Sequence, residues 1–502
     1  MVAEADALLD GAMTPQKTVS SSARRTLHNT ALLITFEIAN PLLSILLVGT
    51  MTRKLGAEGT GAYNLLLNYF FVAHSFTSLG LNSLVTRDVS RDKSAARRHL
   101  CSSITLGLPA SLVMAVGVLI AIRLAGYPAD VVRGAWWVAV SLLPSIVILY
   151  SESIFIAFEK VRYMVGLTMV ENAAKVATGL WLLHHGYGVV ALMSSFAAFR
   201  FMNLLMNLAV FHRRIAPLGW DYDRDILKKL LHSVPVFGTI FVVAALYLRT
   251  DVFMLSKLGT LAAVGYYTIG YRLFAIAQVV PKSFNTSIYP VLSKLFHESQ
   301  DSYQRASSMA VRYILVVLLP IAAGIAGLAD PVVRLLFGPG FGDAASVLKV
   351  VIWTLVPYGI VRVLASSLFA SNRQHIDLKV NLMGLATNVL LNVMLIPRFG
   401  ILGCAWAALI SMCCFLAFQC WFLRHEVGPV LREAEIVRPA LVTLALVAWL
   451  HLTPGLALWA RIAIGAVGYA GLLLALGVVR LDELRAVMPQ PFALPVPEEP
   501  EA

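Results

Sequence analysis

Charged residues are scarce in this 502-residue chain. They make up 14% of it, against about 25% in a typical soluble domain. Hydrophobic residues make up 58%, and the mean hydropathy is +0.76. Acidic residues are scarcer than basic ones: the chain has 28 Asp and Glu against 40 Lys and Arg, which leaves a formal net charge of +12. This composition excludes a soluble globular domain and indicates a polytopic membrane protein, so the excess of positive charge points to membrane topology rather than to nucleic-acid binding.

Several motifs of catalysis and cofactor binding are also missing. The five cysteines stand in no zinc or redox spacing, so they are expected to be small hydrophobic residues of the membrane core. The chain has no G-x-x-x-x-G-K-[ST] loop, which excludes ATP hydrolysis by that route. Residues 1–28 contain no apolar run, so no cleavable signal peptide is expected. The sequence thus predicts neither an enzyme nor a cofactor or metal site.

Long apolar runs are what the chain has instead. A membrane-spanning helix needs roughly 20 predominantly apolar residues. Fourteen stretches meet this requirement, and an even number places both termini on one side of the membrane. The candidate spans are 29–50, 62–84, 100–122, 134–157, 164–183, 187–211, 234–256, 264–292, 306–328, 345–370, 378–397, 400–423, 437–453 and 456–479.

The distribution of Lys and Arg predicts on which side of the membrane the two termini lie. If the N-terminus is cytoplasmic, 24 of the 40 lie in cytoplasmic loops and tails, nine in the opposite loops and seven inside spans. Cytoplasmic loops of membrane proteins carry such an excess. We therefore expect both termini to be cytoplasmic.

One pattern occurs twice along the chain. Lys-Leu-Gly, followed after six residues by Tyr, begins at Lys54 and again at Lys257, 203 positions later. Six crossings restore the same side, so spans 1–6 and 7–12 are predicted to be parallel repeats with a substrate site between them. The predicted parts are a cytoplasmic tail (1–28), an N-lobe (29–211), a cytoplasmic amphipathic linker (212–233), a C-lobe (234–423), two further spans (424–479) and a second cytoplasmic tail (480–502). The predicted fold is an all-α polytopic membrane protein of about 14 transmembrane helices, with two six-helix repeats around a central cavity plus two C-terminal helices.

Polar side chains recur at helical spacing on one face of many spans. Helix–helix hydrogen bonding is one explanation, and it suits Asn and Ser well. It suits Arg and Lys less well, because a charge at membrane depth costs about 2.5–3.5 kcal/mol and usually faces a bundle interior or a watery cavity. The candidate substrate-binding residues are Lys175, Arg200, Arg249, Arg272, Lys282, Arg362, Asn68, Asn203 and Asn388.

Acidic residues inside the spans are the candidates for ion coupling, since a desolvated carboxylate is a natural site for a proton or a cation. They are Glu37, Glu152, Glu171 and Asp251. Glu171 and Lys175 stand four residues apart and can neutralise each other, whereas Arg249 and Asp251 stand two apart and point to different faces. Seven cations against four acids leave a surplus of three positive charges. Such a cavity suits an anionic substrate, and Arg in particular suits diphosphate.

Four segments carry a resemblance to a known family. They are residues 52–91, 249–293, 335–353 and 388–411, which cover spans 1–2 and 7–12. Together they resemble the bacterial oligosaccharide and polysaccharide flippases, of the O-antigen or Wzx type, in the multidrug/oligosaccharidyl-lipid/polysaccharide exporter superfamily. No single charged site of the family transfers residue by residue, so the candidate residues above rest on the polar stripes.

The resemblance implies two lobes with alternating access, and two added helices that help form a lipid-tail groove in the similar lipid II flippases. It implies an undecaprenyl-diphosphate-linked oligosaccharide as substrate, moved to the outer leaflet of the bacterial inner membrane for lipopolysaccharide or exopolysaccharide biosynthesis. Membrane lipid is then an obligatory partner, a polysaccharide polymerase and a chain-length regulator are compatible partners, and nucleic acid is not expected.

Two alternatives remain open from the sequence. An ion-coupled drug or cation antiporter of the same superfamily would be expected to have a net-acidic cavity. A membrane glycan polymerase or ligase would need a large external catalytic loop, and no predicted external loop exceeds about 20 residues.

Overall fold

The computed structural model describes residues 15–370, 373–424, 433–453 and 458–476, and all of their regular structure is helical. Helices of the first half are α2 (Pro15–Ser78), α3 (Asn82–Arg91), η1 (Lys93–Ala95), α4 (Ala96–Leu124), α5 (Ala129–Ala157), α6 (Val161–His184) and α7 (Val189–Arg214). Helices of the second half are α8 (Arg224–Leu258), α9 (Leu261–Ala277), α10 (Val279–Glu298), α11 (Gln300–Gly327), α12 (Ala329–Phe337), η2 (Pro339–Phe341), α13 (Gly342–Val351), η3 (Ile352–Thr354), α14 (Leu355–Ala370), α15 (Gln374–Phe422), α17 (Glu433–Leu452) and α18 (Leu458–Ala475).

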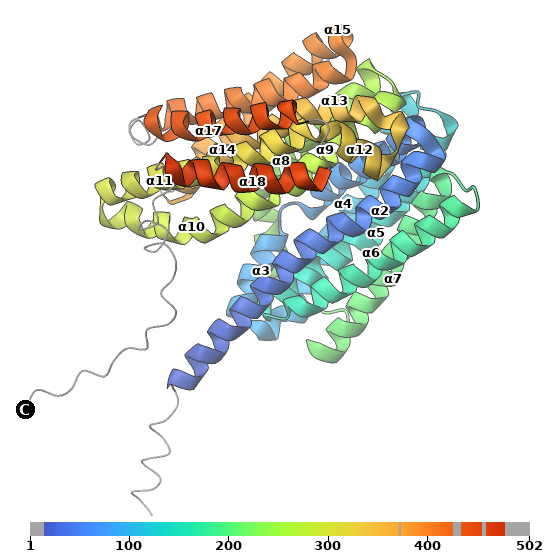
Figure 1. Ribbon diagram of the computed structural model, residues 1–502. Helices are drawn as coiled ribbons and strands as arrows, with labels where there is room; N and C mark the ends of the chain where they lie inside the picture. Colours follow the sequence, from blue (N-terminus) through green and yellow to red (C-terminus); the bar gives the residue numbers. More distant parts are fainter. Residues whose placement is uncertain (1–14, 371–372, 425–432, 454–457, 477–502) are drawn as a thin grey trace, which may run out of the picture.

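The helices gather into two bundles that follow the order of the chain, drawn blue to green and yellow to red in Figure 1. The N-lobe holds α2 to α7, and the C-lobe holds α8 to α15. The two helices that follow lie on the C-lobe, where α17 packs on α11 and α18 packs on α17. Buried apolar side chains of both lobes join in one large core cluster.

Two long helices contain two predicted spans each, separated by a kink at a glycine. In α2 the kink is at Gly56, with φ 65°, and in α15 it is at Gly400, with φ 55°. A side chain at such positive φ would be strained, which explains glycine at both positions. Within the described residues, six helices are long and apolar enough to cross a membrane, and two shorter apolar helices, 438–450 and 460–475, follow them. The number of fourteen spans stays a prediction.

Two predicted boundaries differ from the structure. The predicted span 264–292 is divided at Gln278 into α9 and α10, because Pro281 in the first turn of α10 cannot donate the hydrogen bond that would continue α9. The amphipathic segment before residue 234 is not a separate helix. It forms the first turns of α8, which runs without interruption from Arg224 to Leu258.

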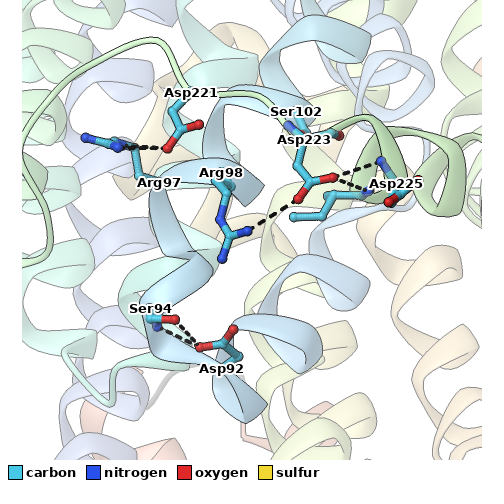
Figure 2. A network of polar contacts seen from close by, with 9 residues as sticks. Asp92, Ser94, Arg97, Arg98, Ser102, Asp221, Asp223 and Asp225 are labelled. Carbon is cyan, nitrogen blue, oxygen red and sulfur yellow. Dashed lines mark hydrogen bonds and ion pairs between the residues drawn. The ribbon is translucent and has the colours of Figure 1, made fainter.

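An extended strap, residues 215–223, joins the lobes and lies on the N-lobe (Figure 2). Arg97 on α4 binds Asp221 at 2.7 Å, and Arg98 binds Asp223 at 3.4 Å. Asp223 also caps α8 by accepting from the backbone N–H of Asp225 at 2.8 Å. These bonds hold the strap against the start of α4.

The first turns of α8 belong to the N-lobe by their contacts. Lys229 binds Asp88 on α3 at 2.7 Å, and Leu230 is buried in the N-lobe core with Leu84 and Leu100. The second half of α8 packs against α15 in the C-lobe. One continuous helix therefore connects the two lobes.

Candidate functional site

A cavity of about 380 Å³ lies between the lobes. One wall comes from α2 of the N-lobe, and the other comes from α8, α9 and α10 of the C-lobe. Its lining residues are Asn64, Leu67, Asn68, Phe71, Leu248, Arg249, Asp251, Val252, Tyr267, Thr268, Tyr271, Arg272, Ala275, Gln278 and Lys282. Four of the predicted substrate-binding residues are among them: Asn68, Arg249, Arg272 and Lys282.

The three cations of the lining keep most of their hydrogen-bond donors unused. Arg249 donates to the Asn68 side-chain oxygen at 3.2 Å and lies 4.9 Å from the centre of the Phe71 ring. Arg272 donates to the Ser44 carbonyl at 3.4 Å, and Lys282 is exposed. A guanidinium has five N–H donors, so both arginines can bind an anion without releasing a protein partner.

The one carboxylate of the lining is held by neutral groups. Asp251 accepts from the Tyr267 hydroxyl at 2.7 Å and from the side-chain amides of Asn388 and Asn392, each at 2.9 Å. Asn388 also donates to Ser411 at 3.2 Å, so the cluster extends into the C-lobe. Arg249, two residues before Asp251 on the same helix, bonds to Asn68 instead, so the two side chains have different partners. Asp251 is thus a carboxylate with no cationic partner among the described residues.

A second polar cluster lies inside the N-lobe around Glu171, which is fully buried. Lys175 approaches its carboxylate at 3.2 Å and Arg200 at 3.4 Å, and Asn203 donates a hydrogen bond to it. Arg200 also lies over the ring of Phe70, 5.4 Å from its centre. These three predicted substrate-binding residues are not in the lining of the cavity, because they neutralise and hydrogen-bond the buried Glu171.

The remaining candidates lie apart from these two groups. Glu152 on α5 accepts from the Thr168 hydroxyl at 3.3 Å. Arg362 on α14 stands over the Tyr358 ring at 6.0 Å and is not in the lining. Glu37 lies on α2, but its side chain is outside the described residues. The described residues contain no group of three His, Cys, Asp or Glu that could hold a metal ion.

Sequence reasoning missed the aromatic side chains of the site and Gln278. Tyr267, Tyr271 and Gln278 line the cavity, yet nothing in an apolar helix distinguishes such a side chain from a core residue. Asn392 belongs to the same polar stripe as Asn388, because it follows Asn388 by one helical turn on the same face. The contact of both with Asp251 joins residues 137 and 141 positions apart, which spacing does not predict.

Tight contacts between the lobes close one end of the cavity, here called the seam end. At the crossing of α2 and α9, a Cβ on Gly61 would meet the Leu261 carbonyl oxygen at 1.8 Å, and one on Gly265 would meet that of Ala57 at 2.1 Å. Only glycine allows this approach. The lining begins beside this crossing at the buried Asn64 and ends at the exposed Lys282.

Further hydrogen bonds between the lobes lie at the same end. Thr52 donates to the Phe337 carbonyl at 2.9 Å, and the Tyr127 hydroxyl is 2.6 Å from that of Ser256. Lys257 donates to the Ala125 carbonyl. The structure therefore represents a state with the seam end closed.

Comparison with known proteins identifies the family. A model of polysaccharide biosynthesis proteins matches residues 26–296, and a model of the lipid II flippase MurJ matches residues 178–478. Each match covers more than half of the chain. The chain belongs to the polysaccharide flippases of the multidrug/oligosaccharidyl-lipid/polysaccharide exporter superfamily. This family membership confirms the resemblance drawn from the sequence.

Individual relatives of this flippase agree with that assignment. It is 24% identical over 401 residues to a probable low-salt glycan biosynthesis flippase, Agl15, of Haloferax volcanii, covering 78% of this chain and 82% of the relative. The inward closed structure of the lipid II flippase MurJ matches with a TM-score of 0.74 at 14% identity, over 89% of this chain and 100% of that one. An inward-facing multidrug transporter of the MATE family matches with a TM-score of 0.63 at 16% identity, over 79% and 98%. The two structures establish the fold of this multi-pass membrane protein.

Proposed function

We propose that this flippase moves a polyprenyl-diphosphate-linked oligosaccharide from the cytoplasmic to the outer leaflet of a bacterial inner membrane. The observation that carries the proposal is the set of three cations, Arg249, Arg272 and Lys282, with free donors in a cavity between two lobes. Diphosphate is a compact anion that accepts several charge-assisted hydrogen bonds, and planar guanidinium groups match it well. Asn64, Asn68 and Gln278 supply the amides that sugar hydroxyls need.

The sign of the cavity's charge separates this proposal from the drug antiporter. Three cations and one carboxylate leave it basic, which favours an anion and repels an organic cation. The names of two relatives, a lipid II flippase and a low-salt glycan flippase, also support a glycan-bearing lipid. The similarity to a multidrug transporter of the MATE family, at 16% identity, concerns the fold alone and does not favour export of organic cations.

In the proposed mechanism, the headgroup enters the cavity while the seam end is closed, and its diphosphate binds Arg249 and Arg272. The lobes then rock against each other, the contacts at the seam end separate, and the headgroup reaches the other side. We assign the linker side to the cytoplasm, with both termini there, since the loops on that side carry most of the Lys and Arg. A polysaccharide polymerase or chain-length regulator would receive the product.

Asp251 is the proposed ion-coupling residue. It lies in the cavity wall, and it accepts bonds from Asn388 and Asn392 of the C-lobe interior. Arg249 stands two residues away on the same helix. A proton or cation at Asp251 would therefore change the position of α8, and with it the anion site at Arg249. Glu152 and Glu171 are weaker candidates, because Glu171 already has two cationic partners.

The decisive experiment is translocation in proteoliposomes with purified protein and a polyprenyl-diphosphate oligosaccharide, in which an impermeant lectin reports the leaflet of the sugar. Translocation faster than in protein-free vesicles supports the proposal. Arg249→Gln and Arg272→Gln should each lower the rate by about tenfold or more, since a charge-assisted hydrogen bond contributes roughly 1.5–3 kcal/mol. Arg133→Gln is the matched control, because Arg133 is exposed and pairs with Asp130 away from the cavity.

Two results would contradict the proposal. If wild-type protein moves no glycan under any gradient, it is not a flippase of these lipids. If Arg249→Gln, Arg272→Gln and Lys282→Gln all transport normally, the basic cavity is not the anion site. Repeating the assay with imposed proton and sodium gradients tests the coupling, and Asp251→Asn should then abolish the dependence on the driving ion.

A further inference from the structure

The turn between α5 and α6 carries a cluster of positive charge at the linker-side end of the N-lobe. We call it the basic cluster, and its cations come from η1, the α5–α6 turn, α6 and α7. They are Lys93, Lys160, Arg162 and Arg214. Three of them are exposed, and Lys160 is half-buried. In the part of the chain that the structure describes, none of the four lines the cavity between the lobes, so the cluster is a separate feature.

Two aromatic rings organise these cations. The ammonium groups of Lys93 and Lys160 lie 5.6 and 5.5 Å from the centre of the Phe158 ring. Arg162 lies 4.9 Å from the centre of the Tyr163 ring and donates to the Tyr163 hydroxyl at 3.2 Å. Cation–π contacts position a charge without neutralising it, so the cluster keeps its positive field.

A hydrogen bond and two neighbouring charges join the cluster to α7. Lys160 donates to the Arg214 carbonyl at 2.6 Å, which connects the α5–α6 turn to the end of α7. Tyr163 precedes the predicted span 164–183. The hydrogen bond from Arg162 lowers the pKa of the Tyr163 hydroxyl, and the charges of Arg214 and Lys160 lower it further. Three of the four cations thus stand close enough to act on one oxygen atom.

The backbone of the α5–α6 turn is fixed by hydrogen bonds. The N–H of Lys160 donates to the Phe155 carbonyl at 2.8 Å, and the N–H of Glu159 donates to the Ile156 carbonyl at 2.9 Å. These bonds close α5 with Glu159 at φ 57°, a conformation that a residue with a Cβ rarely adopts. Phe158 and Lys160, on either side of Glu159, are thereby held in place, as a binding site requires.

The charge of the cluster remains available to a ligand. Two acidic residues stand next to it in sequence, Asp92 and Glu159, so the four cations leave a surplus of two positive charges. Asp92 accepts from the Ser94 hydroxyl at 2.6 Å (Figure 2). Among the described residues, Lys160 uses one of its three N–H donors on a carbonyl, and Arg162 uses one of five on a hydroxyl. The other donors suit an anion with several acceptor oxygens, such as a phosphate.

The position of the cluster favours a lipid as the source of that phosphate. Three helices long and apolar enough to cross a membrane end here: one begins at Lys93, α5 ends one residue before Phe158, and α7 ends at Arg214. Farther along α5 and α7, Ile156 and Leu205 are exposed apolar side chains, as expected where acyl chains cover a helix. Basic pockets between membrane helices on the cytoplasmic side bind anionic headgroups, and aromatic side chains lie at headgroup depth.

We propose that the basic cluster binds the phosphate headgroup of an anionic glycerophospholipid in the leaflet on the linker side. The phosphate lies between Lys160, Arg162 and Arg214, and the acyl chains extend into the bilayer. The strap begins at Ile215, directly after Arg214. A bound lipid therefore holds the N-lobe end of the strap at the membrane surface while the C-lobe moves.

Lipid binding to the purified full-length protein tests this assignment. Native mass spectrometry in detergent counts the lipids retained after addition of dioleoyl phosphatidylglycerol or of the zwitterionic dioleoyl phosphatidylcholine. Wild type should retain phosphatidylglycerol preferentially. Lys160→Gln/Arg162→Gln should lower that affinity by about tenfold, since it removes two cations that face an anionic headgroup. Lys160→Arg/Arg162→Lys keeps both charges and should keep most of the affinity.

The matched control removes two exposed cations on the same side of the protein but outside the cluster. Arg91→Gln/Lys228→Gln should leave phosphatidylglycerol binding unchanged. An equal loss in this control would show that surface charge alone attracts the lipid, and it would overturn a defined site. Normal binding by Lys160→Gln/Arg162→Gln, or an equally large loss in the charge-conserving variant, would overturn it as well.

A second readout separates a lipid from a soluble phosphate. A bimane label on Met164→Cys, with the exposed Cys413 replaced, is measured in phosphatidylcholine nanodiscs. Nitroxide-bearing phosphatidylglycerol should quench it more than nitroxide-bearing phosphatidylcholine, and an excess of glycerol 3-phosphate should leave the quenching unchanged. Displacement would make a soluble phosphate the ligand, and equal quenching by both lipids would mean bulk contact; either result contradicts the proposal. Both assays measure binding alone, so their results do not depend on the proposed transport.

Discussion

At the scale of single residues, arginine occurs in two different settings. Arg249 faces a cavity and makes one hydrogen bond to Asn68, so its charge remains available to a ligand. Arg200 lies beside the buried carboxylate of Glu171, which also has Lys175 as a partner. The first setting suits binding, and the second suits stability of the N-lobe.

Substitution of these two arginines should therefore have opposite signatures. Arg200→Gln leaves a buried carboxylate with one cation fewer, and we expect a loss on the order of 3 kcal/mol of stability. It should appear as a lower melting temperature in detergent. Arg249→Gln should melt like wild type and lose transport. Glu171→Gln should also melt lower than wild type, because it leaves both Lys175 and Arg200 without their acidic partner; if Arg200→Gln and Glu171→Gln both melt like wild type, this cluster does not stabilise the N-lobe.

The sequence predicted part of this arrangement. Helical spacing placed Lys175 beside Glu171 and turned Arg249 away from Asp251, and both relations hold in the structure. The approach of Arg200 to Glu171 could not be predicted, because it joins α7 to α6 through tertiary packing. Local spacing fixes which face of a helix a side chain occupies, and packing alone decides which helix that face meets.

At the scale of helices, the crossing of α2 and α9 depends on two glycines. A Cβ on Gly61 would lie 1.8 Å from a carbonyl oxygen of α9, so the helices must separate to admit it. Gly61→Ala should weaken the seam-closed state. In the Gly61→Ala protein, we expect a cysteine that replaces Asn64 to react faster with an impermeant thiol reagent added from the seam side than the same cysteine does in the protein with Gly61. Gly166→Ala, where a Cβ would have free space, is the control, and equal reaction rates in both variants would contradict the tight crossing.

The strap between the lobes should respond to acid. Hydrogen bonds from the backbone N–H of Asp225 and Ile226 hold the pKa of Asp223 below its ordinary value. Burial alone would raise the pKa of Asp88. The hydrogen bonds from Lys229 and Arg87 outweigh this effect, so the pKa of Asp88 lies below its ordinary value. A carboxyl group with a depressed folded-state pKa stabilises docking above its unfolded pKa of about 3.9 and loses that effect as the pH falls toward the folded value.

A spin label at Leu218→Cys in the strap, with the exposed Cys413 replaced, measures this response. The label should keep the same mobility from neutral pH to about pH 5 and become more mobile below about pH 4. In the variant Asp221→Asn/Asp223→Asn it should be mobile throughout. A transition centred near pH 6 would instead point to a histidine, and the carboxylates would not be the groups that hold the strap.

Helix boundaries show the same limit of sequence reasoning on a larger scale. Hydropathy found the apolar stretches, but it could not show that α8 begins within the predicted linker and is held at its base by the N-lobe. That information lies in contacts such as Lys229 with Asp88. The repeat predicts two six-span halves, which stays a prediction, and it gave no sign of the single helix that connects the two lobes.

At the scale of the whole molecule, transport requires the seam end to open. The lobes meet there through the hydrogen bonds of Thr52 and Tyr127, and the one helix α8 links them from the strap to the seam. A short reversible bifunctional thiol reagent between Tyr127→Cys and Ser256→Cys should hold this end closed. Translocation should stop after crosslinking and return after reduction, while each single variant stays active under the same treatment.

The glycan lipid should still bind the crosslinked protein from the linker side, because Lys282 remains exposed there. If the crosslinked protein still moves glycan, the headgroup does not cross the seam, and rocking of the two lobes is not the transport step.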